Sequence, residues 1–376
     1  MDFSFTEEQT LLRNTVQSLL ADKYDFDTRR KVTKTAEGWR PEIWAQFAEL
    51  GLLAAPFSEE LGGLGGGPIE NMIVMEEFGR HLVVEPYVET VVIAGGFLRE
   101  GGTAAQQEAL IPGIVGGETV WAFAYAEPQG RYNLADLTTT AKKDGSGYTI
   151  NGYKAVVLGA PWAQKLIVTV RTSGGQRDRD GVSVFIVDKS AAGVSTRDYP
   201  TVDGRRASEI TFENVKVGAD ALIGAEGKGL PLVEKITDEA IAALSAEAIG
   251  CMKELNTATV EYCKTRKQFG VPIGKFQVLQ HRMVDMFMAH EQSVSMTYMV
   301  NLKLGESDVE RTKAAAGAKV QIGKAGRFVG QQAVQLHGGM GMTDELNVGH
   351  YFKRLTMIDT QFGNVDHQLK RYSEAA

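Results

Sequence analysis

Residues 261–274, EYCKTRKQFGVPIG, combine features that fit the binding of a dinucleotide. They follow residues 242–260, in which apolar side chains recur at helical spacing, and Pro272 prevents that helix from continuing. The guanidinium of Arg266 suits a pyrophosphate, the ring of Phe269 suits an adenine, and the glycine that follows allows close approach of the backbone. An arginine at a helix end is also favourable simply because its charge interacts with the helix dipole. These residues alone leave both interpretations open.

Composition limits the classes of protein to which the chain can belong. A length of 376 residues exceeds one ordinary hydrophobic core, so two or three domains are predicted. The net charge of −7 argues against a nucleic-acid partner or an anionic membrane partner. No apolar run approaches the roughly 18–20 residues of a membrane span, and the amino terminus lacks a signal-peptide pattern. Cys251 and Cys263 would lie ~18 Å apart on one predicted helix and could not pair, which fits a reducing cytoplasm.

The spacing of apolar residues changes twice along the chain and predicts an α+β fold of three domains. Residues 1–118 are expected to form an all-α domain, with Thr6 at the start of its first helix. Residues 119–226 are expected to form a small β domain, because short β-branched runs alternate there with Asp-Gly and Gly-Gly turns. Residues 227–376 are expected to form a four-helix bundle. The predicted strands are 148–150, 165–172, 181–188 and 209–217, and the four long helices are 230–264, 276–304, 307–336 and 344–373.

Six segments, in the same order along the chain, resemble signatures of the acyl-CoA dehydrogenase family. RKQFGVPIG resembles the family sequence that follows the first long helix of the C-terminal domain. The others are FTEEQTLLRNTVQSLL at 5–20, GLLAAPFSEELGGLGG at 51–66, INGYKAVV at 150–157, GRRASEITFENVKV at 204–217 and QLHGGMGM at 335–342. Because the matches are collinear over nearly the whole chain, it is identified as a member of this family. The same three-domain layout is what the resemblance implies.

The resemblance implies an FAD-dependent enzyme that introduces an α,β double bond into an acyl-CoA thioester. In that reaction a carboxylate removes the α proton while the β hydrogen leaves as hydride to flavin N5. The commonest family motif for the base, Tyr-Glu-Gly-Thr, is missing, because residues 359–366 read DTQFGNVD. Other branches of the family carry the base on the first helix of the C-terminal domain. There Glu247 and Glu239 are the candidates.

The surroundings of the two glutamates differ. Glu247 lies in ALSAEAIG, a small and apolar stretch in which a lone charge is costly to bury without a role or a partner. This segment resembles the branch that acts on bulky or dicarboxylic acyl-CoAs, including pimeloyl-CoA and steroid side-chain enzymes. Glu239 aligns roughly with the base of the isovaleryl type. We prefer Glu247 as the catalytic base, with Glu239 as the alternative, while a third interpretation makes both of them solvated helix charges.

The resemblance also assigns residues to FAD and to CoA. For FAD it maps Arg266 to the pyrophosphate, Phe269 to the adenine, Gln277 to the adenosine end, Gln335, Gly338 and Gly339 to pyrophosphate binding from a neighbouring subunit, and Thr360 and Gln361 to the flavin. His337 is more simply interpreted as a structural turn residue. For CoA, Arg205 and Arg206 are candidate phosphate or pantetheine contacts, with solvated loop charges as the alternative. No metal site is expected.

One wall of the flavin site departs from the family pattern. The usual Trp-Ile-Thr that packs on the isoalloxazine is replaced by residues 156–158, VVL, and a usual Thr-Glu-Pro-Gly run is replaced by residues 126–129, AEPQ. Some members of the bulky-substrate branch are α₂β₂ heterotetramers with fewer flavins than chains. The chain is therefore expected to form a homo-oligomer or an α₂β₂ heterotetramer with a paralogous subunit. Its expected partners are an acyl-CoA substrate and an electron-transferring flavoprotein. The alternatives are an acyl-CoA oxidase on the same fold and a non-catalytic or half-site subunit.

Overall fold

The computed structural model describes residues 4–375, which divide into two compact units. Within that range, the first unit comprises residues up to 31, residues 68–83 and residues from 241 onward. The second unit comprises residues 32–67 and 84–240. Helix α7 (Leu230–Thr265) begins in the second unit and ends in the first.

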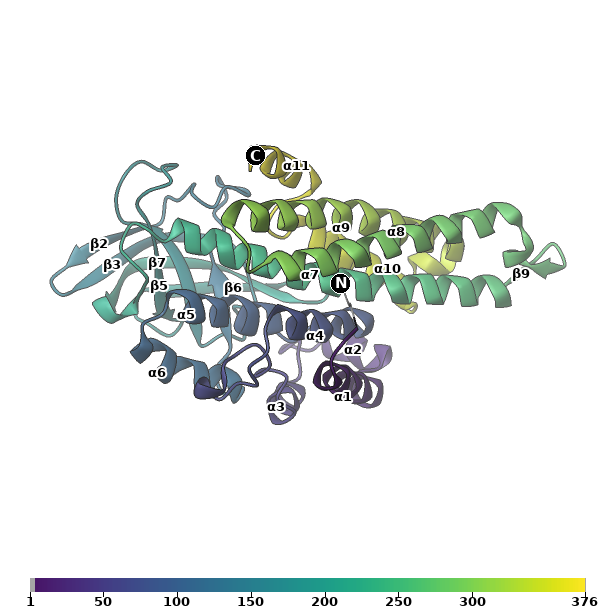
Figure 1. Cartoon of the computed structure of the whole chain (residues 1–376), viewed down its shortest axis with the longest axis horizontal. Helices are drawn as coiled ribbons and strands as arrows, with labels where there is room; N and C mark the ends of the chain where they lie inside the picture. The colour runs from purple at the N-terminus through teal and green to yellow at the C-terminus, as the bar shows by residue number, and fades with distance from the viewer. Residues whose placement is uncertain (1–3, 376) are drawn as a thin grey trace. The chain divides into compact units, whose positions relative to one another are not determined.

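The first unit is a helical bundle with one small hairpin. Its helices α8 and α9 run alongside each other, and the hairpin follows the end of α7 (Figure 1). The alanine-rich stretch of α9 is buried, as its composition predicted, because small side chains allow close helix packing. The elements besides α7 are α1 (Glu7–Lys23), α2 (Phe26–Val32), α4 (Pro68–His81), β9 (Lys267–Gln268), β10 (Val271–Pro272), η4 (Ile273–Lys275), α8 (Gln277–Lys303), α9 (Asp308–His337), η5 (Gly338–Met342), α10 (Asn347–Thr360) and α11 (Val365–Glu374).

Two glycines set the distance between α4 and α7. A Cβ on Gly79 would lie 1.9 Å from the carbonyl oxygen of Glu247, and one on Gly250 would lie 2.0 Å from the carbonyl oxygen of Glu76. Only glycine permits backbones to approach so closely. The position of Glu247 in the bundle is therefore fixed by backbone contact as well as by its side chain.

The last long helix predicted from the sequence, 344–373, is wrong, because the structure has two helices there. Phe362 (φ 55°) and Gly363 (φ 107°) adopt left-handed conformations that end α10. Asn364 then caps α11, since its side chain accepts a hydrogen bond from the backbone N–H of His367 at 3.1 Å. Apolar residues keep helical spacing across this turn, so the periodicity alone did not reveal the break.

Among the described residues, the second unit has six helical elements besides the start of α7. Thr103 caps α6 with a capping box that also involves Gln106. A π-helix, η2, is followed directly by a short α-helix, α5. Besides the start of α7, the helical elements are α3 (Pro41–Glu49), η1 (Glu59–Leu61), η2 (Val88–Ala94), α5 (Gly95–Gly101), α6 (Ala104–Val115) and η3 (Ala219–Ala221).

The sheet of the second unit has eight strands, of which the sequence predicted four. Seven lie in the order β6-β7-β3-β2-β4-β5-β8, and β1 pairs in parallel with β4. The register between β3 and β7 shifts after Lys154, and Val156 in this bulge has a φ of 52° and is half exposed. The strands are β1 (Trp121–Ala124), β2 (Thr140–Asp144), β3 (Gly147–Leu158), β4 (Lys165–Arg171), β5 (Val182–Asp188), β6 (Val194–Pro200), β7 (Arg206–Gly218) and β8 (Leu222–Ile223).

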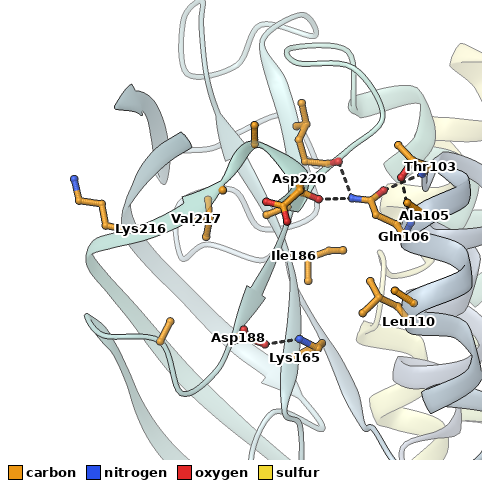
Figure 2. Close-up of a pocket in the computed structure, with 16 residues that line it drawn as sticks. Thr103, Ala105, Gln106, Leu110, Lys165, Ile186, Asp188, Lys216, Val217 and Asp220 are labelled. Atoms are coloured by element: carbon orange, nitrogen blue, oxygen red, sulfur yellow. Dashed lines mark hydrogen bonds and ion pairs between the residues drawn. The ribbon is translucent and has the colours of Figure 1, made fainter. Parts of the chain in front are cut away.

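A groove of about 640 Å³ lies between α6 and the sheet of the second unit (Figure 2). The side-chain amide of Gln106 crosses it and donates to the carbonyl oxygens of Asp220 at 2.7 Å and Leu222 at 3.0 Å. On the opposite side Lys165 pairs with Asp188 at 2.5 Å. Gln106 and Lys165 are thus engaged with other groove residues, whereas Lys216 pairs with Asp144 outside the lining. None of the predicted site residues lines the groove.

Candidate active site

Glu239 is a shielded carboxylate on the part of α7 that belongs to the second unit. Only 12% of its side chain is exposed, and its Oε2 accepts a hydrogen bond from Nη2 of Arg99 at 2.6 Å. Gly96 of α5 lies beside it, because a Cβ built there would lie 3.4 Å from the same oxygen. Burial raises the pKa of Glu239, and Arg99 opposes part of that shift. Such a carboxylate binds a proton more readily than a surface glutamate, as a general base near neutral pH requires.

Glu247, further along α7 in the first unit, forms a closed pair with Arg354 of α10. Its Oε1 and Oε2 accept hydrogen bonds from Nε and Nη2 of Arg354, both at 2.6 Å, and the two side chains are 1% and 3% exposed. A bidentate guanidinium stabilises the ionised carboxylate and occupies both oxygens that would take a proton. Arg354 is thus the partner that a lone buried charge needs, and the sequence analysis did not identify it. The geometry suits a structural ion pair better than a base.

Six of the eight predicted FAD residues lie at one end of the bundle. The rings of Tyr262, near the end of α7, and His337, at the end of α9, are in contact at 4.4 Å between centroids. Arg282 of α8 donates to Gln332 of α9 at 3.2 Å, which brings the start of α8 to the same end. The six residues are Arg266, Phe269, Gln277, Gln335, Gly338 and Gly339.

The end of the bundle fits the adenine and pyrophosphate of FAD. A Cβ on Gly338 or Gly339 would meet nothing within 4 Å, so the backbone there is open to a ligand. Phe269 is 91% exposed, and Arg266 is exposed with no ion pair among residues 4–375. His337, by contrast, is buried and its Nδ1 donates to the carbonyl of Ala333 at 2.8 Å. Burial lowers the pKa of His337. Its buried ring and its backbone hydrogen bond support a structural role.

Thr360 and Gln361 lie apart from those six residues, at the turn between α10 and α11. Lys319 of α9 contacts this turn and is 18 residues from His337 in the same helix, which places the turn about 27 Å along α9 from the glycines. Gln361 is 9% exposed, and its Oε1 has no hydrogen-bond partner within the described part of the chain. A buried acceptor without a donor fits an N–H or hydroxyl group of a flavin. The two groups of predicted FAD residues are therefore well separated along the bundle.

The two arginines predicted to contact CoA have different surroundings. Arg205 is 5% exposed, and its Nη1 faces Oε1 of Glu89 at 3.5 Å inside the second unit. Arg206 is half-buried and donates to the backbone carbonyl of Thr35, with its guanidinium over Gly38. A phosphate would therefore reach Arg206 more easily than Arg205.

A buried pair of Glu127 and Lys154 was missed by the sequence analysis. Nζ of Lys154 lies 2.7 Å from Oε1 of Glu127, and neither side chain is exposed. Oε2 of Glu127 accepts hydrogen bonds from the backbone N–H and the hydroxyl of Thr138, at 2.7 and 2.5 Å. These contacts connect the segment after β1 to the residues just before β2 and to β3. The signal was available, because Lys154 interrupts the otherwise apolar and small KAVV run.

We expect acid to destabilise the second unit through Glu127. Although burial opposes it, Lys154 and Thr138 lower the pKa of Glu127 to about 2 from 4.5. Because its pKa is lower in the folded state, the ionised carboxylate of Glu127 stabilises the fold fully above about pH 4.5. This contribution, up to about 3 kcal/mol, is lost as the pH falls toward 2. Urea unfolding of the wild type and Glu127→Gln over this range should show a smaller acid dependence in the variant. If the free energy of unfolding of Glu127→Gln fell with acid as steeply as that of the exposed control Glu213→Gln, this expectation would be contradicted.

The comparisons with known proteins agree over the length of the chain. Sequence profiles of the acyl-CoA dehydrogenase N-terminal, middle and C-terminal domains match residues 6–118, 122–215 and 227–376. The chain belongs to the acyl-CoA dehydrogenase family. FadE12 of Mycobacterium tuberculosis is 33% identical to it over 362 residues, 92% of this chain and 90% of FadE12. The short-chain-specific acyl-CoA dehydrogenase of Clostridium acetobutylicum is 30% identical and covers 98% of this chain and 97% of its own.

Solved structures of acyl-CoA dehydrogenases share the fold. Butyryl-CoA dehydrogenase of Megasphaera elsdenii superposes with a TM-score of 0.92 at 26% identity, covering 100% of this chain and 99% of its own. The Tcur3481-Tcur3483 steroid ACAD gives a TM-score of 0.89 at 29% identity, over 98% and 97% of the two chains. Acyl-CoA dehydrogenases are flavoprotein oxidoreductases that act on the CH–CH group of acyl-CoA in fatty acid and steroid catabolism. No helix among residues 4–375 is long and apolar enough to cross a membrane.

Proposed function

We propose that this chain is an acyl-CoA dehydrogenase subunit in which Glu239 removes the α proton of an acyl-CoA thioester. The observation that carries the proposal is the buried carboxylate of Glu239, whose pKa is raised by burial. This order of candidates reverses the preference drawn from the sequence, in which Glu247 came first. Both oxygens of Glu247 already bind Arg354, whereas Oε1 of Glu239 accepts no hydrogen bond from the described residues.

The residues around Glu239 support proton transfer to Oε1. Arg99 holds Oε2 at 2.6 Å and so fixes the plane of the carboxylate while the other oxygen stays available. Once the proton has been transferred, the neutral acid is favoured by the same burial that raises the pKa. FAD, held by the residues described above, would accept the β hydrogen as hydride.

The substrate that we propose is a bulky or dicarboxylic acyl-CoA. The SAEAIG segment around Glu247 resembles the branch that uses such substrates, and the Tcur3481-Tcur3483 steroid ACAD is among the similar structures. Arg206 is the candidate for contact with a CoA phosphate, because Arg205 faces Glu89.

We propose an assembly in which more than one chain completes each FAD site. The separation of about 27 Å between the two groups of FAD residues supports sharing. Exposed apolar side chains on α8, a feature of association surfaces, support an oligomer: Val278, Val284, Phe287 and Met288 are 49–60% exposed. One similar structure, at 25% identity and a TM-score of 0.90, is described as the ChsE4-ChsE5 complex of Mycobacterium tuberculosis. The partner chain is a second copy of this chain, with a paralogous subunit as the alternative. An electron-transferring flavoprotein as electron acceptor and a cytoplasmic location complete the proposal.

A second candidate, a half-site or non-catalytic subunit, is favoured by the altered flavin wall at Val156 and by the missing glutamate at residues 359–366. One experiment separates the two candidates. The purified chain is assayed for flavin absorbance per polypeptide and for mass in solution, and acyl-CoAs of different chain types are then added without oxygen. Bleaching of a yellow homo-oligomer by a bulky acyl-CoA is the expected result. A colourless protein that takes up flavin only when co-expressed with a paralogue would make it a half-site subunit.

A further inference from the structure

Lys319 is a buried lysine in the middle of α9. It lies in the alanine-rich stretch that packs inside the bundle, and its side chain is 0% exposed. A buried ammonium group must find acceptors, because the loss of hydration is otherwise too costly. The proposed chemistry does not use this residue.

The acceptors of Lys319 all belong to the turn between α10 and α11. Nζ donates to the backbone carbonyls of Ile358 at 2.6 Å, Asp359 at 2.9 Å and Gly363 at 3.1 Å. An ammonium carries three N–H donors, so these three contacts use its full capacity. Two of the carbonyls precede Thr360 and Gln361, and the third follows them. A single lysine side chain therefore closes the turn that carries both residues.

Other contacts hold the same turn against α9. Gly323, one turn after Lys319, lets α10 come close, because a Cβ there would lie 2.3 Å from Oδ1 of Asp359. The other oxygen of Asp359 pairs with Arg327 at 3.1 Å. The side chain of Gln368 donates to the carbonyl of Phe362 at 2.6 Å. Within this turn the Oε1 of Gln361 is buried and has no hydrogen-bond partner among the described residues.

We propose that Lys319 is a positioning residue that holds the turn after α10 so that Gln361 presents its unpartnered amide oxygen to the flavin. This inference rests on the proposed function, because it takes a flavin as the group that meets Gln361. Lys319 itself contacts only protein carbonyls and so acts through the turn. Its removal should loosen the turn before it affects any other part of the bundle.

The test compares Lys319→Met, Lys319→Gln and the matched control Lys324→Met, which removes an exposed lysine from the same helix. Amide hydrogen exchange is measured on the flavin-free protein. The reporters are the amides of Gln361, His367 and Gln368, which are hydrogen-bonded to Met357 O, Asn364 Oδ1 and Asn364 O. The dissociation constant for FAD is measured on the same proteins, with the paralogue present if it is needed.

In Lys319→Met we expect exchange at these amides to rise about tenfold or more over the wild type, and FAD binding to weaken by about the same factor. Lys319→Gln keeps two N–H donors, so its exchange rates and FAD affinity should lie between those of the wild type and Lys319→Met. It therefore provides the test if the Met variant does not fold. Lys324→Met should match the wild type. Exchange that rises equally in α8 and in the turn, or FAD binding equal in all variants, would overturn the proposal. A wild type that binds no FAD would contradict the proposed function, and the exchange data would then decide whether Lys319 positions the turn.

Discussion

Replacement of Glu239 by Gln lowers the rate of acyl-CoA-dependent flavin reduction by about a thousandfold or more, while flavin content and fold are kept. The amide has nearly the shape of the carboxylate and still offers an oxygen to Arg99, but it cannot accept a proton. The measurement is anaerobic stopped-flow reduction of the flavin by acyl-CoA. Since the pKa of Glu239 is raised, the wild-type rate should also fall with acid at a higher pH than an ordinary glutamate would give.

Two matched variants make the result specific. Glu100→Gln removes the other carboxylate that contacts Arg99 and should leave reduction within a few-fold of the wild type. Glu247→Gln should do the same, because we assign that side chain to an ion pair. A Glu247→Gln protein that keeps its flavin and loses turnover, beside an active Glu239→Gln, would restore Glu247 as the base.

Most of the fold could be predicted from the sequence. The helical and β regions were placed by periodicity and by turn residues, and the order of the six family segments gave the layout. The errors have local causes. Strand β6 is largely exposed, so it lacks the apolar alternation that marks a strand. The break between α10 and α11 depends on left-handed Phe362, a residue type that gives no warning of such a conformation.

The candidate site was harder to predict, because a residue's partner decides its role. Glu247 in SAEAIG looked like a base for the same reason that it makes a good ion pair. A charge buried among small residues is costly unless it has a function or a partner. Arg354, which pairs with Glu247, lies 107 positions away in the sequence. The same signal is present at Lys319 and Lys154, which the sequence analysis did not single out and which are also buried with acceptors. An isolated charge in an apolar run thus predicts a buried polar contact, and only the structure says with which group.

The ion pair of Glu247 and Arg354 gives the largest expected effect on stability. Glu247→Met should lower the free energy of unfolding by about 3–5 kcal/mol, because Arg354 stays buried without a carboxylate. Arg354→Met should lower the free energy of unfolding by about the same amount, because Glu247 then stays buried without a guanidinium. In the double variant no charge is left to bury, so it should be more stable than either single variant. Urea unfolding of the four proteins gives the coupling energy directly. Two small and additive effects would mean that the carboxylate is not held by Arg354 in solution and would return it to the list of possible bases.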